Sequence, residues 1–224
     1  MSTEELPAAA PAMPRGGRRE RGLATRERIL KAATALFIRD GYPATTMAAI
    51  AADADVAVQS LYLRFGSKLA ILKAALDAAV VGDLQPVPLL EREWVGRLAE
   101  TQNGPKAVRL FVGEVMQLLA RTYPIYAVVQ GAAASEAGEL LAENKRQRHE
   151  GTRVIAKELS RKPGFARGMG VDTAADLIYA LATEDHYGVL VVDRGWSPEK
   201  WERWCAQILI GILFPQTPED ARTD

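Results

Sequence analysis

Residues 45–68 constrain the fold of this chain most strongly, because apolar positions recur at helical spacing on both sides of a short polar gap. Thr46 can cap a first helix, since its hydroxyl can accept a hydrogen bond from a free backbone N–H. Asp55 stands where the chain must turn, and aspartate tolerates a left-handed backbone better than most residues do. The apolar positions are Met47, Ile50, Ala51, Val56, Leu61 and Phe65. The pattern predicts two short helices around a tight turn, followed by a helix that starts at Ser67.

The second of these helices leaves unusual side chains on its outer face. Once the apolar positions face the core, Val58, Gln59, Tyr62 and Leu63 point outward. Glutamine can pair with N6 and N7 of adenine, and an apolar side chain can contact a thymine methyl group. The stretch therefore predicts a helix-turn-helix that reads the major groove of duplex DNA. The alternative is a helical hairpin inside an unrelated all-α protein.

Residues 25–42 are expected to form one amphipathic helix upstream of this pair. Its apolar stripe is Ile29, Ala33, Leu36 and Phe37. Gly41 is a suitable helix stop, because glycine adopts the left-handed backbone that ends many helices. Residues 25 to about 81 thus predict three helices and the start of a longer fourth one.

Several runs in this region resemble the tetracycline-repressor (TetR) family of transcriptional regulators, and the resemblance is specific over residues 25–72. The matching runs are Thr-Arg-Glu-Arg-Ile-Leu at 25–30, Leu-Phe at 36–37, Gly-Tyr at 41–42, Thr-Thr-Met at 45–47 and Phe-Gly-Ser-Lys at 65–68. The resemblance implies an all-α protein with an N-terminal three-helix helix-turn-helix DNA-binding domain and a C-terminal helical ligand-binding and dimerisation domain. The implied parts are a disordered basic arm at 1–24, the DNA-binding domain at 25–72, the regulatory domain at 73–216 and a tail at 217–224.

The resemblance also implies which residues contact a palindromic operator. They are Thr46, Ala57, Val58, Gln59, Ser60, Tyr62, Arg64 and Lys68. Lys68 would bind a phosphate at the start of the fourth helix, where free N–H groups also favour anions. The sequence departs from the family pattern at Asp55, which replaces a turn glycine, and at Ala57, which replaces a Ser or Thr cap. Val58 and Arg64 also differ from the common residues, and these changes bear on the operator sequence and the affinity.

The first 24 residues are rich in alanine, proline and glycine and then become basic, with Arg18 and Arg19 among the arginines. This composition predicts a disordered segment. It can be an arm that follows the DNA backbone or enters a minor groove, or an inert tail. Residues 15–68 carry ten Lys/Arg against five Asp/Glu, while residues 69–224 carry eighteen against twenty-one. A basic front on a slightly acidic body is typical of a DNA reader with a separate sensing part.

The rest of the chain is expected to be helical. The patterns predict an apolar helix at 105–121, a shorter segment that begins at Pro124, and a long polar helix from Ser135 to about 162. Asp172 is expected to cap a helix that runs to about 193. Ser197 and Pro198 form a good cap and first turn for the last helix, which should end before residue 215.

The last two predicted helices carry apolar faces, and the resemblance implies that such a pair meets its twofold copy in a homodimer. A dimer also answers a physical need, since two recognition helices read two half-sites. The expected interface residues are Ile178, Leu181, Gly188, Val189, Trp201, Trp204, Cys205, Ile208 and Ile212. The alternative is that these faces are buried within one protomer.

An effector site is a further implication of the resemblance, because family bodies enclose a cavity between the middle helices. The candidate wall residues are Phe111, Val115, Leu119, Tyr126, Asn144, Gln147 and Tyr179. Polar residues on an otherwise apolar face need partners, and a small, mostly hydrophobic effector is one possibility. The alternative is that they are core aromatics and solvated polar residues. His149 and His186 lack companions at metal-ligand spacing, so no metal or other cofactor is expected.

The sequence favours a regulator over an enzyme, because it has no phosphate loop, nucleophile elbow or metal quartet. Cys205 is the single cysteine, which excludes an intrachain disulfide and predicts a buried or interfacial thiol. A membrane-spanning run and a secretory signal are absent, so the expected location is the bacterial cytoplasm, on the nucleoid when DNA is bound. The predicted function is a ligand-responsive repressor. The alternative is a helical protein-binding module whose DNA-binding head has degenerated.

Overall fold

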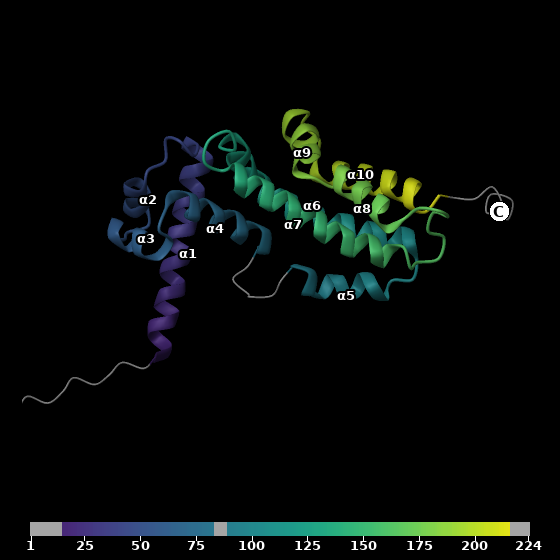
Figure 1. The fold of residues 1–224 in the computed structure, drawn as a ribbon, viewed down its shortest axis with the longest axis horizontal. Helices are drawn as coiled ribbons and strands as arrows, with labels where there is room; N and C mark the ends of the chain where they lie inside the picture. The colour runs from purple at the N-terminus through teal and green to yellow at the C-terminus, as the bar shows by residue number, and fades with distance from the viewer. Residues whose placement is uncertain (1–14, 83–88, 216–224) are drawn as a thin grey trace, which may run out of the picture.

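The computed structural model describes residues 15–82 and 89–215, and every regular element in these two ranges is helical. The all-α prediction is therefore confirmed for the described residues. At one end of the molecule, three helices form a head, and a fourth leads from it towards the rest of the chain (Figure 1). These elements are α1 (Arg15–Asp40), α2 (Met47–Asp53), α3 (Val58–Phe65) and α4 (Lys68–Val81).

The remaining helices form an elongated body, in which α6 and α7 run side by side away from the head (Figure 1). Helix α8 packs on α7, and α10 packs on α6. The elements are η1 (Leu89–Glu91), α5 (Glu93–Glu100), α6 (Gly104–Gly131), α7 (Gly138–Leu159), α8 (Val171–Leu181), α9 (Glu184–Tyr187), the π-helical turn η2 (Gly188–Asp193) and α10 (Pro198–Leu213). Among the described residues, no helix is both long and apolar enough to cross a membrane.

Two hydrophobic cores hold the molecule together, and α6 contributes to both. The head core joins buried residues of α1 to α4 to the C-terminal part of α6, including Ile125, Tyr126 and Val129. The body core contains the N-terminal part of α6, including Phe111, together with α5, α7, α8 and α10. Helix α4 also runs across the predicted domain boundary between residues 72 and 73. The head is therefore anchored on the body rather than joined to it by a free linker.

The expected disordered arm is wrong for residues 15–24, because α1 begins at Arg15. Extending a helix that is already formed costs little, since each added residue gains a hydrogen bond. Arginine, glutamate and leucine are also good helix formers, which offsets the glycines of this stretch. Arg18 and Arg19 lie on this helical extension. Residues 1–14 of the predicted arm and the predicted tail at 217–224 lie outside the described residues.

The predicted break at Pro124 is also wrong, because α6 continues through it to Gly131. A proline inside a helix removes one backbone hydrogen bond and costs about 3 kcal/mol. Leu119 on one side and Ile125 and Tyr126 on the other are almost fully buried. Each such buried side chain contributes about 1.5–3 kcal/mol. Tertiary packing on both sides of the proline therefore outweighs its local cost.

The segment at 172–193 is not the single helix that its periodicity predicts. Helix α8 ends at Leu181, and Thr183 starts α9 by accepting a hydrogen bond from the backbone N–H of His186 at 3.2 Å. Gly170, rather than Asp172, is the N-cap residue of α8. Helix α5 is a further element that the sequence patterns did not predict. The cap at Ser197 is confirmed, because its hydroxyl accepts from Lys200 N at 3.2 Å.

Candidate nucleic-acid interface

The turn between α2 and α3 has the geometry that its sequence predicts. Asp55 has a φ of +52°, the one positive value at a non-glycine position among the described residues. The Val56 N–H then donates to the Ala51 carbonyl at 3.0 Å, which closes the turn. Val56 and Leu61 pack into the head core on either side of it. The turn thus fixes the direction of α3 relative to α2, as a helix-turn-helix requires.

The outer face of α3 exposes the side chains that the sequence assigned to base contact. Val58 is 37% exposed, Tyr62 is 53% exposed and Leu63 is 92% exposed. Gln59 and Ser60 are exposed as well. Large apolar side chains on an exposed helix face mark an interaction surface rather than a plain solvated one. Ala57, the N-cap residue of α3, makes no side-chain cap, so a backbone N–H near the start of the helix is left for another acceptor.

Three further residues that the sequence assigned to DNA contact also have structural roles. Thr46 caps α2 by accepting from the backbone N–H of Ala49 at 3.1 Å. Arg64, at the end of α3, donates to the carbonyl of Gly22 on α1 at 3.2 Å. Lys68 donates to the carbonyl of Tyr42 at 2.8 Å, and its ammonium lies 4.2 Å from the centre of the Tyr42 ring. Lys68 keeps two further N–H donors, so phosphate contact and this packing are compatible.

The predicted effector residues do not form one group. Phe111 and Leu119 are buried in the body core, and Val115 packs against that core. Gln147 is exposed and donates to Glu143 at 2.7 Å. Tyr179, in contrast, accepts from Arg148 at 3.3 Å. The predicted apolar residues therefore belong to the body core, while Tyr179 lies beside Arg148 of α7.

Arg148 and Glu184 form a buried ion pair that sequence reasoning missed. Arg148 follows Asn144 by one helical turn on α7, and this spacing was the available signal. The Tyr126 ring also lies near the guanidinium, 5.9 Å from ring centre to guanidinium carbon. Burial raises the pKa of the Tyr126 hydroxyl, against a lowering effect of nearby Arg148. The structure thus brings Tyr126 and Tyr179 together beside a buried charge, with Asn144 one turn away on α7.

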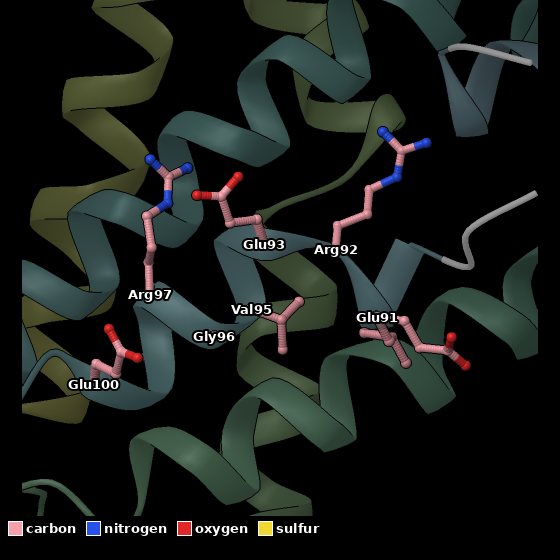
Figure 2. Close-up of a pocket in the computed structure, with 8 residues that line it drawn as sticks. Glu91, Arg92, Glu93, Val95, Gly96, Arg97 and Glu100 are labelled. Atoms are coloured by element: carbon pink, nitrogen blue, oxygen red, sulfur yellow. The ribbon is translucent and has the colours of Figure 1, made fainter. Parts of the chain in front are cut away.

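The surface hollows lie elsewhere. A groove of about 390 Å³ is lined by residues 90–93, 95–97 and 100, with several charged side chains projecting from η1 and α5 (Figure 2). A smaller hollow of about 190 Å³ lies between α5 and α7, beside Leu98 and Val154. Neither contains a predicted effector residue. The groove of Figure 2 is built from one local segment, so its shape does not depend on the arrangement of the long helices.

The residues predicted for a dimer interface divide into two groups. Ile178, Trp201 and Cys205 are fully buried inside the protomer, so these three assignments are corrected to core positions. Gly188 is also buried, and a Cβ placed there would lie 2.4 Å from Tyr123, which shows that its close contact is with α6 of the same chain. Burial raises the pKa of the Cys205 thiol to about 12.

The second group retains accessible surface. Val189 is 51% exposed and Val192, also on η2, is 55% exposed. Leu181, Trp204, Ile208 and Ile212 are partly exposed. Apolar surface is therefore left on two elements that follow α9 along the chain. On η2 it comes from Val189 and Val192, and on α10 it comes from Trp204, Ile208 and Ile212.

Comparison with known proteins agrees with this architecture. Residues 29–75 match the family model described as bacterial regulatory proteins, tetR family. The chain is 28% identical to the HTH-type transcriptional repressor SCO4008 of Streptomyces coelicolor, over 75% of this chain and 80% of that protein. It resembles the crystal structure of NalD, the secondary repressor of the MexAB-OprM multidrug efflux pump in Pseudomonas aeruginosa, with a TM-score of 0.63, 20% identity, and coverage of 88% of this chain and 100% of that one. The fatty acid degradation regulator FadR of Bacillus halodurans gives a TM-score of 0.66 at 17% identity, with coverage of 84% and 95%.

The fold and the exposed face of α3 define a helix-turn-helix DNA-binding protein with a helical body. Within that class, residues 29–75 carry the DNA-binding domain of the tetR family of bacterial regulatory proteins. The family is non-enzymatic, which agrees with the choice of a regulator over an enzyme.

Proposed function

We propose that this protein is a transcriptional repressor that binds a palindromic operator as a homodimer and leaves it when a small-molecule effector binds the body. The observation that carries the proposal is the outer face of α3, where Val58, Tyr62 and Leu63 are exposed beside Gln59. A repressor role is supported by the 28% identity to a protein described as a transcriptional repressor. The protein would act in the bacterial cytoplasm, on the nucleoid.

Each part of the face has a distinct role in this proposal. Gln59 and Val58 read base edges, while Thr46, Tyr62 and Lys68 contact the backbone. Arg64 holds the N-terminal part of α1 beside the recognition helix through Gly22. Arg18 and Arg19 lie on that same helical extension, which would bring positive charge close to the DNA. The operator sequence then depends mainly on Val58 and Gln59.

The exposed apolar residues of η2 and α10 support the dimer. Val189, Val192 and the partly exposed Trp204, Ile208 and Ile212 are the residues that a second copy would cover. A twofold interface uses the same patch on both copies, so this single face is sufficient. A dimer places two copies of α3 on two half-sites of a palindrome.

The effector would bind in the body, as the family resemblance implies. The predicted residues Tyr126 and Tyr179 lie beside Arg148, while the apolar residues Phe111 and Leu119 stabilise the body core. Effector and operator would bind to different arrangements of the same protein, so each weakens the other.

The experiment that tests DNA binding is fluorescence anisotropy of a labelled random-sequence duplex at increasing salt. A DNA reader loses affinity steeply as salt rises, because bound phosphates release counterions. Lys68→Ala should lower affinity for all sequences alike and reduce the salt dependence by about one phosphate contact. Lys73→Ala is the control, because Lys73 lies on the same helix and pairs with Asp77 at 2.8 Å. Binding that is absent or independent of salt would instead support a protein-binding module with a degenerate head.

A further inference from the structure

The ion pair between Arg148 and Glu184 lies in an enclosed polar site between α7 and α9. The Arg148 side chain is 15% exposed and the Glu184 side chain is 6% exposed. A terminal nitrogen of the guanidinium donates to the Tyr179 hydroxyl at 3.3 Å. The Tyr179 ring centre lies 4.8 Å from the guanidinium carbon, and the Tyr126 ring lies further away at 5.9 Å. One carboxylate and two aromatic rings therefore surround this charge.

Three buried polar atoms in the same region have no hydrogen-bond partner among the described residues. They are the Tyr126 hydroxyl oxygen, Asn144 Oδ1 and Arg148 Nε. Tyr126 is fully buried, and Asn144 lies one turn before Arg148 on α7. Buried polar atoms in folded proteins nearly always have a partner, so a cluster of unpaired ones indicates a missing polar group. Asn144 Oδ1 is an acceptor, the Tyr126 hydroxyl can donate or accept, and Arg148 Nε is a donor that belongs to a cation.

Glu184 occupies this site from a short element that a break in the helix separates from α8. Helix α9 has 4 residues, and the backbone breaks at Ala182 before it. Gln130 of α6 donates a hydrogen bond to Asp185 at 2.9 Å, and the buried Tyr187 ring packs against Tyr123 and Trp201. The turn η2, with exposed Val189 and Val192, follows α9 directly. Movement of Glu184 would therefore be transmitted to residues that the proposed dimer covers.

We propose that Arg148 anchors the carboxylate of an amphipathic effector, which takes the place of Glu184 in the ion pair. The proposal rests on the effector response put forward above and names its chemistry. A carboxylate is the group that the site already holds, and arginine binds carboxylates with two parallel hydrogen bonds. The unpaired Nε supplies a second donor for that arrangement. The rings of Tyr179 and Tyr126, 4.8 Å and 5.9 Å from the guanidinium carbon, supply apolar surface beside the anchored group.

This exchange gives a direct route from effector to DNA. The effector carboxylate replaces the Glu184 carboxylate on Arg148, and the Glu184 side chain turns away from the guanidinium. No covalent bond changes, and the net charge at Arg148 is preserved. The loss of this ion pair at the start of α9 shifts η2 and with it the proposed dimer face, which sets the separation of the two heads. Neutralising Glu184 should therefore favour the effector, while removing Arg148 should abolish its preference for a carboxylate.

Isothermal titration calorimetry of the full-length protein with octanoate and octan-1-ol, both below the micelle concentration, tests the proposal. The wild type should bind octanoate about ten-fold tighter than octan-1-ol, because the effector carboxylate also accepts from the unpaired Arg148 Nε while the displaced Glu184 carboxylate regains water. Glu184→Gln should tighten octanoate binding by about another ten-fold, because the internal competitor loses its charge. Arg148→Met alone leaves Glu184 buried without a partner and risks misfolding.

The double variant Arg148→Met with Glu184→Gln removes both charges and should bind the acid and the alcohol equally. Arg146→Met is the matched control, because Arg146 is an exposed arginine on α7 that pairs with Glu143. Equal binding of the two probes to the wild type, or no octanoate binding by a folded Glu184→Gln variant, would overturn the proposal. In either case the proposed function would still hold if the protein binds DNA in a salt-dependent way and an effector of another chemical class reverses that binding. Loss of DNA binding itself would count against the proposed function instead.

Discussion

The hydroxyl of Tyr42 donates a hydrogen bond of 2.6 Å to Oε2 of Glu136, although the two residues are 94 positions apart in the chain. Tyr42 lies in the loop after α1, inside the head core, and Glu136 lies in the turn between α6 and α7. The carbonyl of Tyr42 also accepts from Lys68, at the start of α4. One residue thus links the body to the lysine that we assign to a phosphate contact.

Tyr42→Phe should lower the free energy of unfolding by about 1 kcal/mol at neutral pH, because one hydrogen bond is lost. Burial, followed by the bond to Glu136, raises the pKa of the Tyr42 hydroxyl in the folded protein. The protonated hydroxyl therefore contributes its full stabilisation below the unfolded pKa of about 10 and loses it as the pH rises further. Chemical denaturation at pH 7 and at higher pH measures this. Tyr62→Phe is the control, because Tyr62 is exposed. An equal loss in both variants would contradict the role of the bond.

Asp55→Gly should stabilise the protein by about 1 kcal/mol, because a non-glycine residue in the left-handed region costs about 1–2 kcal/mol. Asp55 has a φ of +52°. Asp53→Gly should have the opposite sign, since Asp53 is in α2, where glycine is about 1 kcal/mol less favourable than the best helix former. Thermal unfolding of the two variants, side by side, checks the prediction. A loss of stability in Asp55→Gly would show that the aspartate side chain makes an unrecognised contribution.

The Cys205 thiol should be inert in the native protein at pH 8. Its pKa is raised to about 12 by burial, and the thiolate is the reactive form. Iodoacetamide, followed by intact mass measurement, should leave the native protein unmodified and label the protein in denaturant completely. Rapid labelling of the native protein would show that the body core opens around α10.

Val192→Asp should convert the proposed dimer into monomers while leaving each protomer folded. Val192 is 55% exposed in one protomer, and a charge buried in an interface without a partner is strongly unfavourable. Val154→Asp is the control, because Val154 is a valine of similar exposure, 46%, on α7. Sedimentation velocity of the two variants tests the assignment. A dimer that survives Val192→Asp would place the interface elsewhere.

The head could be predicted from sequence because its signals are local. Thr46 and Ser67 are caps, Asp55 is a turn residue, and the apolar spacing around them fits one arrangement of short helices. Each of these features depends on neighbours within a few residues. The exposure of Val58 and Tyr62 on α3 then follows from which face is buried.

The body was harder to predict because distant contacts decide its breaks. Pro124 is retained inside α6 because residues on both sides of it are buried in different cores. The interruption after Leu181 has no proline or glycine at that point, and Gly188 packs on Tyr123 from another helix. The partner of Arg148 is 36 residues away, so no short motif could reveal it. Periodicity identifies a buried face, but it does not distinguish burial within a protomer from burial between two.

Selection of bound duplexes from a random library, at physiological salt and with the full-length protein, tests the central claim most directly. The wild type should enrich a palindrome, and Gln59→Ala should enrich a different sequence at the positions that this side chain reads. A folded wild-type dimer that enriches no sequence, or a Gln59→Ala variant that enriches the same palindrome with the same base preferences, would contradict the assignment of α3 as the base-reading helix.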